Sequence, residues 1–117
     1  MIKIINNFFD DDKYNQVIHH IKNNIYFTPR YFSTENRKIY YGDRFVLEED
    51  KNLYDTFKKQ AEKKFKLKIN KTHDSGIDLR NLSEWQPHND YGPSKINILI
   101  MLDGPVGVTT GTCFYTD

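Results

Sequence analysis

The chain has 117 residues, with 17 basic and 16 acidic side chains and a formal net charge of +1. This length fits one domain, residues 1–117. The balanced charge gives no global reason to expect a nucleic acid or an anionic membrane as partner. Aromatic residues make up 15% of the chain, which argues for a packed fold rather than a disordered one. The single cysteine excludes an internal disulfide framework, and no apolar run approaches a membrane span in length. A cytoplasmic protein without a signal peptide is therefore expected.

The N-terminal third predicts a strand and a helix. Residues 2–5 have the composition of a short strand. Asp10 to Asp12 then offer N-cap oxygens and negative charge at a helix start. Apolar side chains follow at helical spacing from Tyr14 to Ile25, which predicts a helix over residues 11–24.

The middle of the chain predicts irregular strands and a second helix. Residues 25–47 are rich in Tyr, Phe and Arg and predict two or three strands, with turns at residues 28–29 and 41–43. A second helix is predicted over residues 49–65, with an apolar stripe formed by Leu53, Phe57, Ala61 and Phe65. The lysines of residues 58–71 could contact phosphates, but the acidic residues nearby favour a solvated face.

The second half of the chain has the character of strands. Alternation of apolar and polar residues predicts strands near residues 67–69 and 77–82. Residues 95–102 are apolar on both faces for most of their length, as in a strand covered on both sides. A final strand at 112–115 would leave an exposed edge that invites association. Helices first and strands after predict an α+β fold, and the second half looks like the opening half of a β-barrel or jelly roll.

His88-Asn89-Asp90 is the most informative motif of the sequence. A His and a carboxylate two residues apart can share one face of an extended segment. This spacing supplies two of the three ligands of the facial His/carboxylate/His site that binds non-heme iron. The tripeptide by itself is close to noise. The alternative interpretation is a turn, because Asn89 and Asp90 lie next to Gly92 and Pro93.

In its wider setting the motif resembles a known family. The stretch of residues 76–103 runs through His-x-Asp and a short loop into a long apolar segment that ends in Leu-Asp, and Gly-x-Thr-x-Phe/Tyr-like residues follow at 111–115. This order is similar to that of the Fe(II)/2-oxoglutarate-dependent oxygenases, above all the prolyl-4-hydroxylase-like branch with its small microbial and phage relatives. The resemblance covers residues 76–115 and, more loosely, 1–25. It implies N-terminal helices followed by an incomplete double-stranded β-helix (jelly roll or cupin-like).

The resemblance also implies a cofactor set and its ligands. His88 and Asp90 would bind Fe(II), 2-oxoglutarate would be the cosubstrate, and O2 would be activated to hydroxylate a C–H bond of a peptide or small molecule. In relatives the third ligand is a later His, yet no His follows His88 before the last residue, Asp117. A truncated or fragmentary oxygenase domain is therefore expected. His73 precedes the motif and is a weak substitute, and His19 and His20 on the first helix are read as surface polar residues, with His20 on the solvated face and His19 near the edge.

Further site residues follow from the same resemblance. Cosubstrate binding is expected at Arg80, Lys95, Asn97 and Met101. Met101 stands where relatives often have Tyr, and a thioether cannot donate a hydrogen bond. For Arg80 and Lys95, a role as surface charges that flank strands is the alternative.

The aromatic side chains on either side of the motif, Trp85 and Tyr91, are expected to line a substrate groove, with packing at a barrel rim as the alternative.

Two other functions stay open from the sequence. One is a non-catalytic jelly-roll binding module with a relict His-x-Asp motif, which predicts that Asp90→Ala is tolerated. The other is a nucleic-acid-binding domain that uses the lysines of residues 58–71. The near-neutral net charge and the lack of a known reader motif make the latter the weakest of the three.

Overall fold

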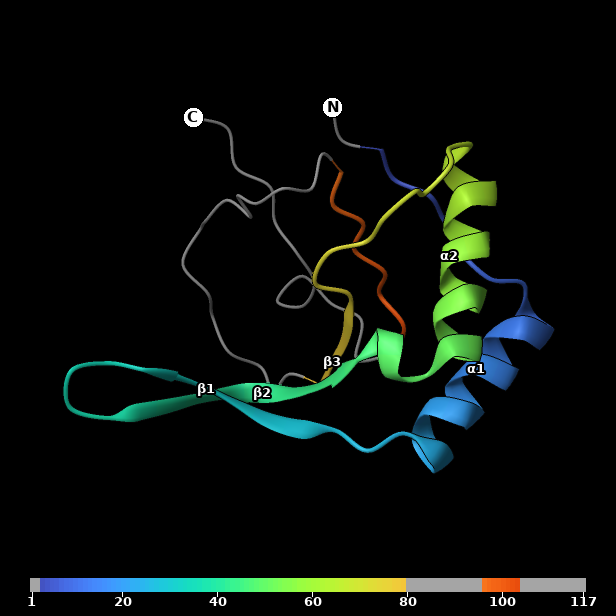
Figure 1. Ribbon diagram of the computed structural model, residues 1–117. Coiled ribbons are helices and arrows are strands. Elements are labelled where there is room, and N and C mark those ends of the chain that lie inside the picture. The colour runs from blue at the N-terminus through green and yellow to red at the C-terminus, as the bar shows by residue number, and fades with distance from the viewer. Residues whose placement is uncertain (1–2, 80–95, 104–117) are drawn as a thin grey trace.

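The computed structural model of the protein describes residues 3–79 and 96–103. Two α-helices lie against one face of a small antiparallel sheet, and the β1–β2 hairpin projects beyond them (Figure 1). The elements in chain order are α1 (Asp11–Asn24), β1 (Thr28–Ser33), β2 (Lys38–Val46), a 3₁₀ turn (Leu47–Glu49), α2 (Lys51–Phe65) and β3 (Gly76–Leu79). The predicted α+β class is confirmed. In the described part of the chain, neither helix has the length and apolar character to cross a membrane.

Both helices begin at the aspartates that the sequence offers as caps. Asp10 accepts a hydrogen bond from the Lys13 backbone N–H at 2.8 Å, and Asp50 accepts one from the Leu53 backbone N–H at 3.1 Å. Each carboxylate satisfies a backbone donor that the helix leaves unpaired, and its charge complements the helix dipole. The prediction for the first helix is confirmed, and the second helix starts two residues later than predicted.

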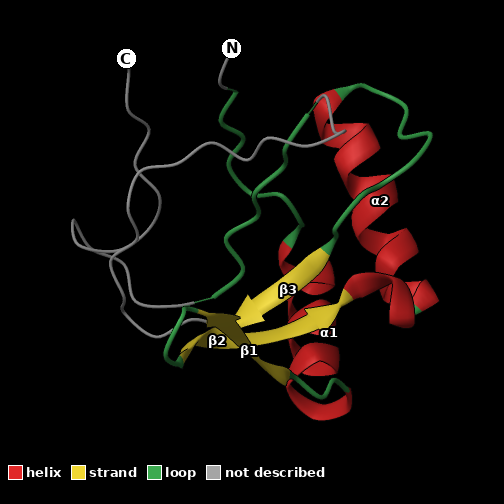
Figure 2. Cartoon of the chain, turned by 60° about the vertical axis from the view of Figure 1, so that its left-hand side comes forward, coloured by secondary structure: helices red, strands yellow, loops and turns green. Residues whose placement is uncertain are grey.

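The sheet has the order β1-β2-β3 among the described residues, with both neighbouring pairs antiparallel (Figure 2). The predicted turns at residues 28–29 and 41–43 are wrong, because the former begin β1 and the latter lie inside β2. The register of β1 and β2 shifts opposite residues 40–42, and Gly42 there has a φ of 135°. The glycine therefore marks a β-bulge rather than a chain reversal.

The core lies between the helices and the sheet. Phe57 of α2 stands at its centre, with the Phe9 ring edge-on at a centroid distance of 5.4 Å and the Phe8 ring stacked at 6.5 Å. The buried apolar side chains are Phe9, Val17, Ile21, Leu47, Leu53, Phe57, Ala61 and Ile77. They come from the segment before α1, both helices, the 3₁₀ turn and β3, so these parts of the chain share one core.

Two of the predicted strands are loops in the structure. Residues 3–5 form no strand, and Ile4 is 80% exposed. Residues 67–69 keep the predicted alternation, with Leu67 and Ile69 half-buried, but their backbone binds the end of α2. Leu67 N–H donates to the Glu62 carbonyl at 3.2 Å, and Ile69 N–H donates to the Glu62 carboxylate at 2.9 Å. These donors are therefore used before a neighbouring strand could pair with them.

Residues 96–102 are extended but form no strand, which corrects the prediction of a strand covered on both sides. From residue 97 onward the burial alternates. Ile100 and Leu102 pack against the core, while Leu99 is 65% exposed and Met101 67% exposed. The Tyr14 hydroxyl of α1 donates to the Leu102 carbonyl at 2.6 Å and fastens this segment to the helix.

Candidate functional site

Most of the residues that the sequence assigns to the site lie outside the described residues. These are the metal ligands and their neighbours: Arg80, Trp85, His88, Asp90, Tyr91 and Lys95. The final predicted strand at 112–115 also lies outside them. Asn97 and Met101 are described, and both are exposed on the outer face of the 96–103 segment.

The described residues contain three of the four histidines. His19 and His73 are exposed, and His20 is half-buried. Within residues 3–79 and 96–103, no group of three His, Cys, Asp or Glu side chains could hold a metal ion.

His20 forms the main polar link between the two helices. Its Nε2 atom lies 2.7 Å from the Asp50 carboxylate, the residue that caps α2. Its Nδ1 atom lies 3.2 Å from the side-chain amide nitrogen of Asn24. The expectation for the two histidines is wrong: His20 faces α2 and His19 is solvated. The periodicity of the first helix did not reveal this, because the partner lies 30 residues away.

The charge of Asp50 is stabilised at this link. The hydrogen bond from His20 lowers the pKa of Asp50 below its usual range, and the backbone hydrogen bond from Leu53 lowers it further. Both ring nitrogens of His20 have hydrogen-bond partners. The pair therefore joins α1 to the N-terminus of α2.

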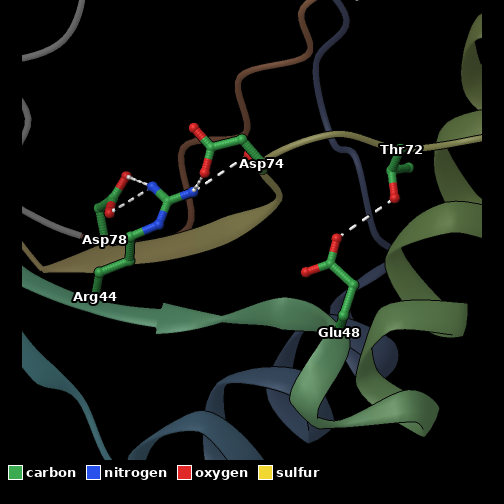
Figure 3. Close-up of polar contacts among 5 residues, drawn as sticks. All are labelled: Arg44, Glu48, Thr72, Asp74 and Asp78. Carbon is green, nitrogen blue, oxygen red and sulfur yellow. Dashed lines mark hydrogen bonds and ion pairs between the residues drawn. The ribbon is translucent and has the colours of Figure 1, made fainter.

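A second polar cluster fastens β3, the strand that precedes the His88 motif in sequence. Arg44 of β2 donates from Nη1 to both oxygens of Asp78, at 3.0 and 3.2 Å (Figure 3). Its Nη2 atom donates to the Asp74 carboxylate at 2.8 Å and to the Asp74 carbonyl at 3.2 Å. The Arg44 side chain is only 16% exposed. One guanidinium thus bridges two carboxylates, which its planar fork allows and a lysine would not.

Gly76 makes room for this arrangement. A Cβ atom at residue 76 would lie 2.6 Å from Arg44 Nη2 and closer still to Nε and Cζ. Gly76 does not have a positive φ, so its role is steric rather than conformational. The pattern Asp74-x-Gly76-x-Asp78, in which a position without a side chain lies between an acid of the preceding loop and an acid of β3, is the sequence signal that could have pointed to an arginine here.

The loop before β3 is held at further points. The Tyr54 hydroxyl lies 2.6 Å from the Thr72 hydroxyl. The Thr72 hydroxyl donates to the Glu48 carboxylate at 3.4 Å (Figure 3). The Leu47 backbone N–H donates to the Ser75 carbonyl at 3.1 Å. These contacts, with the Arg44 cluster, define where β3 starts and which face its residues present.

One hollow on the described surface lies between the end of α1 and the start of α2. It has a volume of about 550 Å³, is wide open to solvent, and is lined mainly by polar residues, among them Asn24, Thr28, Glu49 and Asn52. An open polar hollow of this kind does not exclude water, and burial of a ligand is what small-molecule sites need. We assign no chemistry to it.

Comparison of the chain with protein-family models, with curated proteins and with solved structures gave no match.

Proposed function

We propose that this chain acts in a non-heme Fe(II)- and 2-oxoglutarate-dependent dioxygenase, with His88 and Asp90 as metal ligands. The observation that carries the proposal is the order of features from residue 76 to residue 115, in which His-x-Asp precedes a long alternating segment and a Gly-rich turn. We further propose that the antiparallel sheet is part of a double-stranded β-helix. A sheet with helices on one face and an extended segment after the motif is compatible with that architecture.

The donor chemistry of the motif fits the metal. A neutral imidazole and a carboxylate are ligands that suit Fe(II), and a third donor would complete a facial set. The bound ion would supply sites at which 2-oxoglutarate and O2 react, giving hydroxylation of a C–H bond. The protein residues would orient the substrate and exclude water.

The contacts of Arg44 with β3, the strand before the His88 motif, support the proposal. His88 follows nine residues after the end of β3 at Leu79. Arg44 ties Asp78 of β3 to β2, so the backbone that leads toward the motif starts from a fixed position. Ligands that must meet a metal need such support, because a misplacement of about 1 Å costs much of the activity.

The test measures Fe(II) binding and 2-oxoglutarate turnover together. Purified protein is titrated with Fe(II) under anaerobic conditions by calorimetry, and succinate formed after admission of O2 is quantified. We expect one Fe(II) per chain, bound weakly because His88 and Asp90 supply two of the three facial ligands. This binding, and any 2-oxoglutarate-dependent succinate formation by the chain alone, should fall about 100-fold or more in His88→Ala and Asp90→Ala.

His19→Ala is the matched control, because His19 is exposed on α1 and lies outside the motif. It should behave as the parent protein does. A wild-type protein that binds no Fe(II), or His88→Ala and Asp90→Ala variants that bind it unchanged, would overturn the proposal and favour a non-catalytic binding module. His73→Ala tests the substitute ligand, and an effect as large as that of His88→Ala would assign His73 to the site.

A further inference from the structure

The net charge of +1 conceals a strong separation of charge along the chain. Residues 58–71 contain seven lysines and one glutamate, a contribution of +6, so the remainder of the chain carries −5. This segment forms the second half of α2 and the loop that leaves it. The balanced total is therefore not informative about this region.

Five of these lysines are exposed, and we call this set the basic surface: Lys59, Lys63, Lys66, Lys68 and Lys71. None of the five forms an ion pair with any residue in the described ranges. Glu62, the acid within the segment, directs its carboxylate to the Ile69 backbone N–H. The positive charge of the basic surface is thus uncompensated by local salt bridges.

The first three lysines lie toward the C-terminal end of α2. Lys59 and Lys63 are four residues apart and share one face of the helix. Lys66 is the C-cap residue, with a left-handed φ of 53°, and lies just beyond the last turn. The helix dipole accounts for lysines in the last turn. It does not account for Lys68 and Lys71, which lie in the loop beyond the helix.

A lysine from the other end of the sequence adds to this region. Lys3 Nζ lies 6.0 Å from the centroid of the Phe65 ring, at the C-terminal end of α2. The ammonium is within the range of a cation–π contact. A residue 62 positions away therefore brings further positive charge to the same end of the helix.

We propose that the basic surface binds the phosphate backbone of double-stranded nucleic acid without reading its sequence. This inference is independent of the proposed dioxygenase activity. Lysine ammonium groups act as compact point charges on phosphate oxygens, whereas bidentate recognition of bases is the strength of arginine. Single strands are less suited, because they need exposed aromatic side chains for stacking. The aromatic residue within the segment, Phe65, is half-buried and has Lys3 above its ring.

The burial of the apolar face of α2 argues against insertion of this helix into an anionic membrane. A helix that lies in a membrane interface inserts its apolar face between the lipids. The apolar face of α2, formed by Leu53, Phe57 and Ala61, is buried in the core of the protein. Insertion would therefore require the core to open.

The experiment measures fluorescence anisotropy of a labelled mixed-sequence DNA duplex over a series of salt concentrations, without iron or 2-oxoglutarate. The variant K59Q/K63Q/K68Q removes three charges and keeps residues of similar helix propensity. The matched control R30Q/R37Q/K38Q removes three charges from the β1–β2 hairpin, so both variants have the same net charge.

For the parent protein we expect weak binding with a Kd of about 10⁻⁴ to 10⁻⁶ M that weakens steeply with salt. K59Q/K63Q/K68Q should weaken binding about tenfold or more at about 50 mM salt. The slope of log Kd against the logarithm of the salt concentration should fall by about 2.7, because each of the three lost phosphate contacts contributes about 0.9. The hairpin control should change Kd by less than about twofold.

Three results would overturn the proposal: no duplex binding at low salt, equal losses in the two triple variants, or tighter binding to phosphatidylserine vesicles than to the duplex. A duplex RNA of the same sequence distinguishes the two kinds of nucleic acid, and comparable affinity for both is expected for contacts to phosphates alone. Because the assay contains neither metal nor cosubstrate, its failure is separate from failure of the dioxygenase proposal.

Discussion

Replacement of Gly76 by alanine tests whether the Arg44 cluster depends on the open space above β3. The new Cβ would lie too close to the guanidinium of Arg44, which must then move away. The tip of an arginine side chain moves at little steric cost, so the penalty is the loss of its hydrogen bonds to Asp78 and Asp74.

The magnitude follows from the exposure of the partners. Asp78 is 32% exposed and bound through both oxygens, so its pair with Arg44 is worth about 1 kcal/mol. Asp74 is 78% exposed, and its pair contributes only about 0.3 kcal/mol after screening by solvent. Alanine in a strand gains about 0.5 kcal/mol over glycine through the unfolded state. We therefore expect Gly76→Ala to destabilise the protein by about 1 kcal/mol.

The decisive comparison is made in an Arg44→Ala background. Without the guanidinium the clash is absent, so Gly76→Ala should there stabilise the protein by about 0.5 kcal/mol. Urea unfolding followed by circular dichroism of the four proteins gives the coupling energy, expected near 1.5 kcal/mol. An equal cost of Gly76→Ala in both backgrounds would refute the steric explanation and show that the backbone at residue 76 matters by itself.

Two further predictions concern the contacts of α1. The hydrogen bond from His20 lowers the folded-state pKa of Asp50 below its ordinary pKa of 3.8. The ionised carboxylate therefore stabilises the fold at pH values above 3.8, and this stabilisation is lost as the pH falls through the lower, folded-state pKa. Asp50→Asn should therefore be less stable than the parent at pH 6, and urea unfolding should show the difference shrinking as pH falls below 3.8. A difference that stays constant as pH falls would contradict the linkage. Tyr14→Phe removes the hydrogen bond to Leu102 and should cost about 0.5–1.5 kcal/mol in the same assay. Tyr26→Phe is its control, because Tyr26 is 88% exposed, and equal losses in the two variants would argue against the contact.

The helices could be predicted because their signals are local. Asp10 and Asp50 are the N-cap residues, and their side chains indicate where the two helices begin. The spacing of Leu53, Phe57 and Ala61 indicates the buried face of α2. Such signals operate within one or two turns of the chain. Little outside the helix is needed to read them.

The strands were harder because a strand is defined by its neighbour. Ile69 alternates with polar residues as a strand residue would, yet its N–H binds the Glu62 carboxylate. Gly42 is a residue type that is common in turns, but it lies at a β-bulge, where the register of the β1–β2 pairing shifts. Pairing partners come from tertiary structure, which a single sequence does not contain.

The candidate site shows the same division. The His88 and Asp90 motif was predicted from spacing and stays a prediction. The pairs that join distant elements, His20 with Asp50 and Arg44 with Asp78, lie 30 and 34 residues apart and were not predicted. A charged residue can find many partners of opposite sign in a chain of this composition, so sequence alone does not select one.

The contact between Tyr14 and Leu102 has a consequence for synthesis of the protein. The two residues are 88 positions apart. At about 5–20 residues per second, a ribosome adds Leu102 roughly 4–18 s after Tyr14. During that interval α1 has been synthesised, but Ile100 and Leu102, which pack against the core in the folded protein, have not. The nascent chain thus exposes part of an apolar surface for seconds, which is the period in which a chaperone would be most useful to it.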